Sequence, residues 1–146
     1  MREILFRGKR LDNGEWVEGY LYEHKPPLVG IVSENDVPEP SKWFIARTGF
    51  ADWNMPRPVE LVEVDPSTVG QYTGRKDKNG KRIFEGNILN FDGTVFVCYW
   101  DDGNLEFGLR NSEESIGMAY MAVYDAEIIG NIHDNKILLN NQEPGE

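Results

Sequence analysis

Short runs of alternating apolar and polar residues, separated by clusters of turn residues, cover most of this chain. Alternation over residues 15–22 assigns two sets of side chains to opposite faces of a strand: Trp16, Glu18 and Tyr20 on one, and Val17, Gly19 and Leu21 on the other. Comparable runs predict further strands over residues 59–64, 87–91, 94–100, 105–109 and 126–132. Turns recur about every eight to twelve residues, which is typical of a β-sandwich or a small barrel. The pattern therefore predicts a mainly β fold with little helix.

Prolines interrupt this pattern in the middle of the chain, between Pro26 and Pro58. Because proline cannot donate to a sheet ladder, we expect mostly loop here, with short strands only near residues 28–32 and 43–46. Asp65 followed by Pro66 predicts a capped single helical turn over residues 66–68. Residues 111–124 predict a loop with one short helix, for which Ser112 is a weak capping signal.

One segment of the sequence has a degenerate copy. Residues 6–21 and 72–89 share, in the same order, an aromatic residue, Gly, two cations, Asn-Gly, Glu-Gly and a final Leu. Asn-Gly supplies the positive φ angles of a type I′ hairpin turn. We therefore predict a two-residue loop, Asn79-Gly80, between strands over residues 71–75 and 82–84, or a slightly longer loop if residues 76–78 stay unpaired. The glycine of each Glu-Gly pair is expected at a bend or bulge where a side chain would clash.

Charge is distributed unevenly along the sequence. The net charge is −10, and from Ile83 onwards only Arg110 and Lys136 oppose twelve carboxylates. Five cations, in contrast, lie within eight residues around the second Asn-Gly: Arg75, Lys76, Lys78, Lys81 and Arg82. Nucleic-acid affinity comes mainly from cations that neutralise phosphates, so we expect a chain this acidic to bind nucleic acid poorly. We interpret the cluster as a solvated hairpin tip and a candidate interaction surface, with a phosphate-binding patch as the alternative.

Residue patterns that carry known chemistry are weak. His24 and His133 have no Cys or His neighbour at ligand spacing, and the sequence has no phosphate loop or nucleophile motif. Cys98 lies in an apolar run, where we expect it to pack as a small hydrophobe. The aspartates that could gather around a divalent metal do not follow the spacing of a calcium loop: Asp101, Asp102, Asp125 and Asp134. We predict no catalytic, cofactor-binding or metal site, and we expect a non-enzymatic protein.

The aromatic residues suggest a second interaction surface. Trp43 and Trp53 lie in the proline-rich stretch, so we consider them interface anchors, with core packing as the alternative. Apolar surface that is hard to hide within one chain predicts a homo-oligomer at micromolar concentration. The sequence contains no apolar run of about 18 residues, which predicts no membrane span. A charged opening without an apolar segment argues against a secretory signal, so we expect the cytosol.

Two segments carry a resemblance to a known family. The opening Met1-Arg2-Glu3-Ile4-Leu5-Phe6-Arg7-Gly8-Lys9 and the segment Val69 to Leu89 resemble the YopX-like family of phage and prophage proteins. The resemblance implies an SH3-like small barrel over residues 67–146, with a short tail, packed with a smaller N-terminal β region over residues 1–66. Asn87 stands where the family pattern leads us to expect Asp.

The resemblance does not bring a biochemical activity with it, because none is established for this family. We expect a phage- or prophage-encoded protein-interaction or assembly module in the host cytosol, with a second copy or a phage or host protein as partner. Two alternatives remain open. One is a nucleic-acid-directed role, through the basic hairpin Arg75 to Arg82 or through mimicry by the acidic half. The other is an enzyme whose site is shared between subunits.

Overall fold

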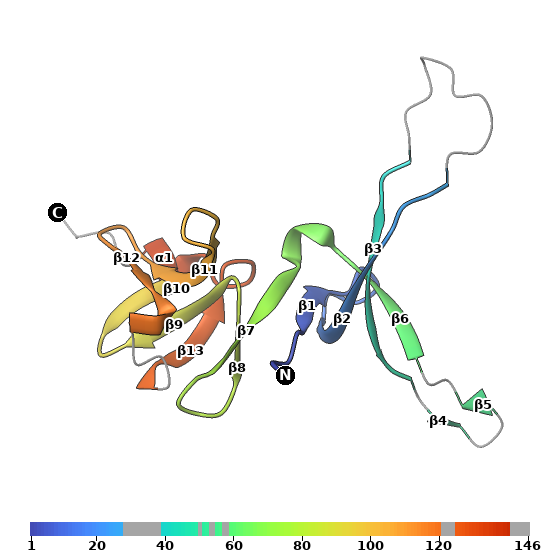
Figure 1. The fold of residues 1–146 in the computed structure, drawn as a ribbon, viewed down its shortest axis with the longest axis horizontal. Helices are drawn as coiled ribbons and strands as arrows, with labels where there is room; N and C mark the ends of the chain where they lie inside the picture. Colours follow the sequence, from blue (N-terminus) through green and yellow to red (C-terminus); the bar gives the residue numbers. More distant parts are fainter. Residues whose placement is uncertain (28–38, 50, 53–54, 57–58, 121–124, 141–146) are drawn as a thin grey trace, which may run out of the picture. The chain divides into compact units, whose positions relative to one another are not determined.

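The structure is a computed structural model and describes residues 1–27, 39–49, 51–52, 55–56, 59–120 and 125–140. The chain divides into two compact units. The N-terminal unit comprises Leu5–Val69, and the C-terminal unit comprises Met1–Ile4 together with Gly70–Glu146. Both consist of antiparallel β-structure with very short helices, so the prediction of a mainly β fold is confirmed (Figure 1).

The N-terminal unit is a strongly curled antiparallel sheet. Its main strands pair in the order β6-β3-β2-β1. Their bounds are β1 Phe6–Lys9, β2 Trp16–His24, β3 Lys42–Thr48 and β6 Val59–Val64. A small hairpin, β4 Ala51–Asp52 and β5 Met55–Pro56, lies between β3 and β6 in the chain. The strands predicted over residues 15–22, 43–46 and 59–64 are thereby confirmed, whereas the strand expected near residues 28–32 lies outside the described residues.

The two outermost strands of this order also meet each other. An antiparallel bridge joins Arg10 to Val64, and the Asp65 amide donates to the Lys9 carbonyl at 2.9 Å. The predicted helical turn, η1 Pro66–Thr68, follows directly and is capped as expected, because Asp65 accepts from the Ser67 amide at 3.0 Å. The curled sheet therefore encloses an apolar core of Val17, Ile45, Val62 and Val64.

Gly19 allows β2 to approach β3 closely. A Cβ atom built on Gly19 would lie 2.2 Å from the carbonyl oxygen of Ala46 on the neighbouring strand. No side chain fits at that distance, so β2 and β3 can pair here only around glycine. The clash predicted for a side chain at the glycine of the first Glu-Gly pair is confirmed, whereas the bend or bulge is not, because Gly19 lies in regular register with Phe6.

The C-terminal unit contains a hairpin and a larger antiparallel sheet. The hairpin consists of β7 Gly70–Lys76 and β8 Arg82–Phe84. The sheet has the order β12-β11-β10-β9-β13. Its strands are β9 Asn87–Phe91, β10 Thr94–Asp101, β11 Glu106–Arg110, β12 Ser115–Gly117 and β13 Glu127–Asn131, with η2 Met118–Tyr120 before β13 and α1 Ile137–Asn140 after it. The strands predicted over 87–91, 94–100, 105–109 and 126–132 are confirmed, whereas β12 was expected to be loop.

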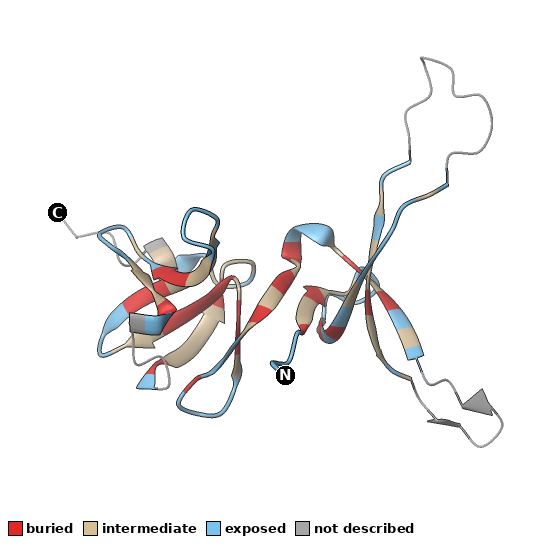
Figure 2. Ribbon diagram, viewed as in Figure 1, coloured by how far each residue is buried: buried red, intermediate tan, exposed pale blue. Residues whose placement is uncertain are grey.

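Strands β9 to β12 follow one another as a meander, and β13 returns to pair with β9. The main apolar cluster of the unit includes Phe96, Cys98 and Leu109, and Ile88 is buried on the opposite face of the sheet. Figure 2 shows the buried positions along these strands. Among the described residues, the strands pair from β12 at one edge to β13 at the other, and no ladder joins these two edges. Closure into an SH3-like barrel therefore stays a prediction.

The tip of the β7–β8 hairpin differs from the two-residue loop that we predicted. Lys76 pairs with Arg82, and the Asp77 amide donates to the Lys81 carbonyl at 2.8 Å, so three residues form the loop. Gly80 has φ +77°, but Asn79 is not among the residues with positive φ, which excludes a type I′ turn. The loop is instead consistent with a type I turn followed by a glycine in the left-handed conformation, which also joins two antiparallel strands but uses three residues.

We predict that Gly80→Val lowers the free energy of unfolding by about 1 kcal/mol or more, because a β-branched residue is strained at positive φ. A Cβ at Gly80 would meet no atom within 4 Å, so backbone strain alone is tested. Urea denaturation measures the change. Lys81→Val is the control, since it places the same side chain one residue later in the exposed tip and is expected to cost less than about 0.5 kcal/mol. Equal stability of the two variants would contradict the assigned turn.

Candidate functional site

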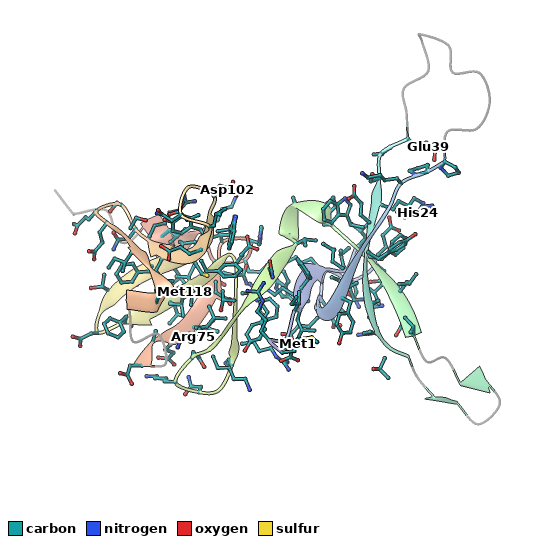
Figure 3. All side chains as sticks on the ribbon, viewed as in Figure 1. Met1, His24, Glu39, Arg75, Asp102 and Met118 are labelled. Atoms are coloured by element: carbon teal, nitrogen blue, oxygen red, sulfur yellow. The ribbon has the colours of Figure 1, made fainter. Side chains whose placement is uncertain are left out.

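The five cations of the predicted interaction surface all belong to the β7–β8 hairpin and its loop, where Figure 3 labels Arg75. Two of them are engaged within their own unit. The Lys78 Nζ lies 3.4 Å from a Glu127 carboxylate oxygen, and an Arg82 guanidinium nitrogen lies 3.4 Å from Glu3. Arg75, Lys76 and Lys81 are exposed and form no ion pair within the part of the chain that the structure describes. We call these three residues the basic tip.

A buried carboxylate holds the basic tip in place. Asp77 is only 5% exposed although cations surround it in the sequence. One carboxylate oxygen accepts the Asn79 and Lys81 amides at 2.9 and 2.8 Å, which fixes the loop. The other accepts the Ile128 amide of β13 at 3.1 Å, and next to it the Lys78 amide donates to the Ala126 carbonyl at 2.9 Å. The hairpin loop is therefore fastened to the last strand of the sheet.

The electrostatics of Asp77 follow from these contacts. Burial raises the pKa of its carboxyl, but the amides of Ile128, Lys81 and Asn79 together outweigh burial and hold the pKa below the ordinary value of 3.8. The anion is thus the form that the fold selects. No sequence pattern indicated this role, because Asp77 stands there only as one negative charge among neighbouring cations.

The aromatic candidates are placed differently from each other. Trp43 lies on the inner side of β3 and packs, partly buried, against the core of the N-terminal unit. Trp53 lies outside the described residues. The exposed aromatic surface of this unit is instead on the opposite side of the same sheet. The sequence patterns did not predict an interface there.

That opposite side, which we call the outer face, carries five apolar side chains, Tyr20, Tyr22, Phe44, Val59 and Leu61, with the carboxylates Glu18 and Glu63 beside them. Tyr20 and Leu61 are 64% and 53% exposed and flank Ala46 on either side of β3. Tyr22 is 45% exposed, pairs with Phe44 across the strands, and its ring centroid lies 6.2 Å from that of Phe44. The alternation over residues 15–22 assigned Tyr20 to the face opposite Val17 and Leu21, and the structure shows that the face of Tyr20 is the outer one.

The candidate catalytic residues of the sequence make contacts that are typical of structural side chains. Cys98 is buried in the core beside Met118. Asp101 accepts the amides of its own turn, Gly103 and Asn104, at 2.9 and 3.2 Å. His24 is exposed at the end of β2, and its Nδ1 lies 3.0 Å from the Tyr22 hydroxyl (Figure 3). Among the described residues, no group of three or more His, Cys, Asp or Glu side chains could hold a metal ion.

Asn87, the residue that departs from the family pattern, is buried and bonds in two directions. Its Oδ1 accepts the Phe84 amide at 2.7 Å, and its Nδ2 donates to the Gly130 carbonyl at 3.4 Å. An aspartate could make only the first of these bonds, since an ionised carboxylate has no proton to donate. Asn87 thus links the turn after β8 to β13.

We predict that Asp77→Asn lowers the free energy of unfolding by about 1–3 kcal/mol, because its amide NH₂ would face at least one backbone N–H that loses its acceptor. The depressed pKa of Asp77 also sets a pH dependence. Its stabilisation is fully present above the unfolded-state value near 3.8 and is lost as the pH falls below it. Urea denaturation at neutral pH and at about pH 3 measures both effects.

Asp92→Asn serves as the matched control, since Asp92 is an exposed carboxylate in another hairpin turn. The stability difference between wild type and Asp77→Asn is expected to shrink at low pH, and Asp92→Asn is expected to follow wild type. A constant difference at both pH values would contradict the role of the Asp77 carboxylate.

Comparison with known proteins agrees with this architecture. The family model described as YopX protein matches residues 5–140. The crystal structure of protein EF1440 from Enterococcus faecalis is similar in fold, with a TM-score of 0.50 at 21% sequence identity, over 95% of this chain and 99% of that one. No curated protein matches the chain. The resemblance inferred from the two sequence segments is confirmed, and the chain belongs to the YopX protein family.

Proposed function

We propose that this protein is a phage- or prophage-encoded, non-enzymatic assembly module that associates with a second copy of itself through the outer face. The observation that supports the proposal is the exposure of Tyr20, Tyr22, Val59 and Leu61 together on one side of a single sheet. Contiguous exposed apolar patches mark interaction sites, and tyrosine is common among the residues that dominate binding energy.

The composition of the outer face favours a second copy as the partner. The apolar residues of its β2 side are aromatic, Tyr20 and Tyr22, and those of its β6 side are aliphatic, Val59 and Leu61, while each side also carries one carboxylate, Glu18 or Glu63. A two-fold axis along the intervening strand β3 would place the aromatic side of each copy over the aliphatic side of the other. Such an arrangement uses the same patch on both subunits, which is the requirement of a closed two-fold dimer.

Within the part of the chain that the structure describes, the residue types that often act in catalysis have structural roles, and this supports a non-enzymatic function. Its one cysteine is a core residue, Asp65, Asp77 and Asp101 hold turns, and its basic hairpin tip is fastened by structural hydrogen bonds. No helix within the described residues is long and apolar enough to cross a membrane. Assembly through side chains of a sheet face requires none of the groups that catalysis would need.

The basic tip supports a second candidate function, contact with nucleic acid. Arg75, Lys76 and Lys81, which are exposed and form no ion pair with any described residue, would release about three counterions, giving a log–log salt slope of about −3. The tip is however attached to a chain of net charge −10, whose field acts over about one Debye length at physiological salt. We therefore regard the second candidate as the weaker one.

We predict no measurable binding to random DNA or RNA at about 0.15 M salt, where ordinary non-specific binders reach only roughly 10⁻⁴ to 10⁻⁶ M. A salt-titrated fluorescence anisotropy assay is the measurement. Submicromolar binding that weakens with salt, and that is lost when Arg75, Lys76 and Lys81 are changed to Ala, would place the nucleic-acid function first.

We predict that light scattering on the purified protein gives a dimer mass at micromolar concentration, and that Tyr20→Ser combined with Leu61→Ser shifts the mass to that of the monomer. Replacing two buried interface anchors by serine removes about 1.5–3 kcal/mol of apolar burial for each. The control is Leu105→Ser, which removes a 75% exposed leucine from the C-terminal unit and is expected to leave the mass unchanged. A monomer mass for the wild type across the concentration range would refute assembly through this face.

A further inference from the structure

The C-terminal unit contains a half-open cleft of about 350 Å³ on the face of its sheet opposite Phe96 and Cys98. Val95 and Val97 of β10 form one wall, and they alternate along the strand with the core residues Phe96 and Cys98. Ile132, just after β13, and Leu139 of α1 also line the cleft. Its volume lies within the range of roughly 300–1,000 Å³ that is typical of small-molecule sites, and these four side chains are aliphatic.

The polar lining of the cleft consists of hydrogen-bond donors. Arg110 lies opposite Val97 in the strand register, and its guanidinium carbon lies 4.6 Å from the centroid of the Tyr99 ring, a stacking contact that positions the charge. Asn111 and Ser112 follow it in the chain and also line the cleft. The cation, the amide and the hydroxyl thus come from three consecutive residues.

These donors have no acceptor within the described residues. The Asn111 Oδ1 already accepts the Glu113 and Glu114 amides at 2.9 Å each, which fixes the turn and leaves the NH₂ group available to a ligand. Arg110 forms no ion pair in that part of the chain, although twelve carboxylates lie between Ile83 and the last residue. Glu113 and Glu114, its acidic neighbours in the following turn, are both exposed.

We propose that this cleft binds a medium-chain fatty acid anion. The aliphatic tail would contact Val95, Val97, Ile132 and Leu139, and the carboxylate would accept from Arg110, Asn111 and Ser112. Carboxylates form charge-assisted, often bidentate hydrogen bonds with a guanidinium group, which distinguishes an anion from a neutral polar group at this position. An apolar cleft bordered by one fixed cation selects a ligand that is apolar along its length and anionic at one end. The inference does not depend on the proposed assembly function.

Methyl NMR with octanoate as the probe tests the proposal on the full chain. We expect saturable shifts of the Val95, Val97, Ile132 and Leu139 methyl signals, with Val62 and Val17 of the N-terminal unit unchanged. Octylammonium, which has the same tail and the opposite charge, is expected to cause no saturable shift. Equal shifts from both probes, or no saturation with octanoate, would overturn the proposal.

Two variants test the role of the donors. Arg110→Gln is expected to weaken octanoate binding roughly tenfold or more, because it removes a charge-assisted hydrogen bond. Arg75→Gln is the matched control, since Arg75 is an exposed cation of the same unit away from the cleft, and unchanged affinity is expected. Ser112→Ala, a small change in an exposed turn, is expected to weaken binding by a smaller factor. Wild-type affinity in Arg110→Gln would overturn the carboxylate assignment.

A third probe separates the two sources of an aliphatic carboxylate. Acetyl-Ala-Leu carries the carboxylate and side chain of a peptide C-terminus. We expect octanoate to bind more tightly, because its longer tail covers more of the aliphatic wall. Tighter binding of acetyl-Ala-Leu would overturn the fatty acid assignment in favour of a peptide terminus.

Discussion

The alternation of side chains along β-strands is the constraint from which the surfaces of this protein follow. Successive residues of a strand point to opposite faces, so a sheet that buries one face exposes the other unless a second layer covers it. In the N-terminal unit the curled sheet encloses Val17, Ile45, Val62 and Val64. The residues that alternate with them must then point outwards, and these include the apolar Tyr20 and Leu61 as well as Glu18 and Glu63. The outer face is thus a consequence of how this sequence fills its core.

Hydrogen bonding imposes the second constraint, in the C-terminal unit. A three-residue hairpin loop leaves backbone amides that need acceptors, and Asp77 supplies them while also reaching Ile128 of β13. Asn87 makes a similar link between the turn after β8 and Gly130. Both side chains are buried polar groups with partners on separate segments. The hairpin that carries the basic tip is therefore part of the sheet unit rather than a free arm.

The sequence was sufficient for the elements whose signal is local. Strands with strict alternation or a compact apolar run, such as residues 59–64 and 87–91, have the predicted bounds, and the Asp65-Pro66 cap is where its chemistry requires it. Features that depend on distant residues were missed. The length of the Asn79-Gly80 loop is set by Asp77 and its contact with Ile128, 51 positions away, and β12 forms only because β11 offers an edge. Which side of the sheet Trp43 lies on, and which residues form the outer face, depends on the register that joins β2, β3 and β6.

A dilution series followed by methyl NMR tests whether a second copy of the chain covers the outer face. Val59 and Leu61 report on the aliphatic residues of the face, and Leu105 reports on an exposed site in the other unit. If a dimer forms through the outer face, the Val59 and Leu61 signals shift with protein concentration along one binding curve while Leu105 stays constant. Signals from Val59 and Leu61 that do not change between dilute and concentrated samples would contradict dimer formation through this face.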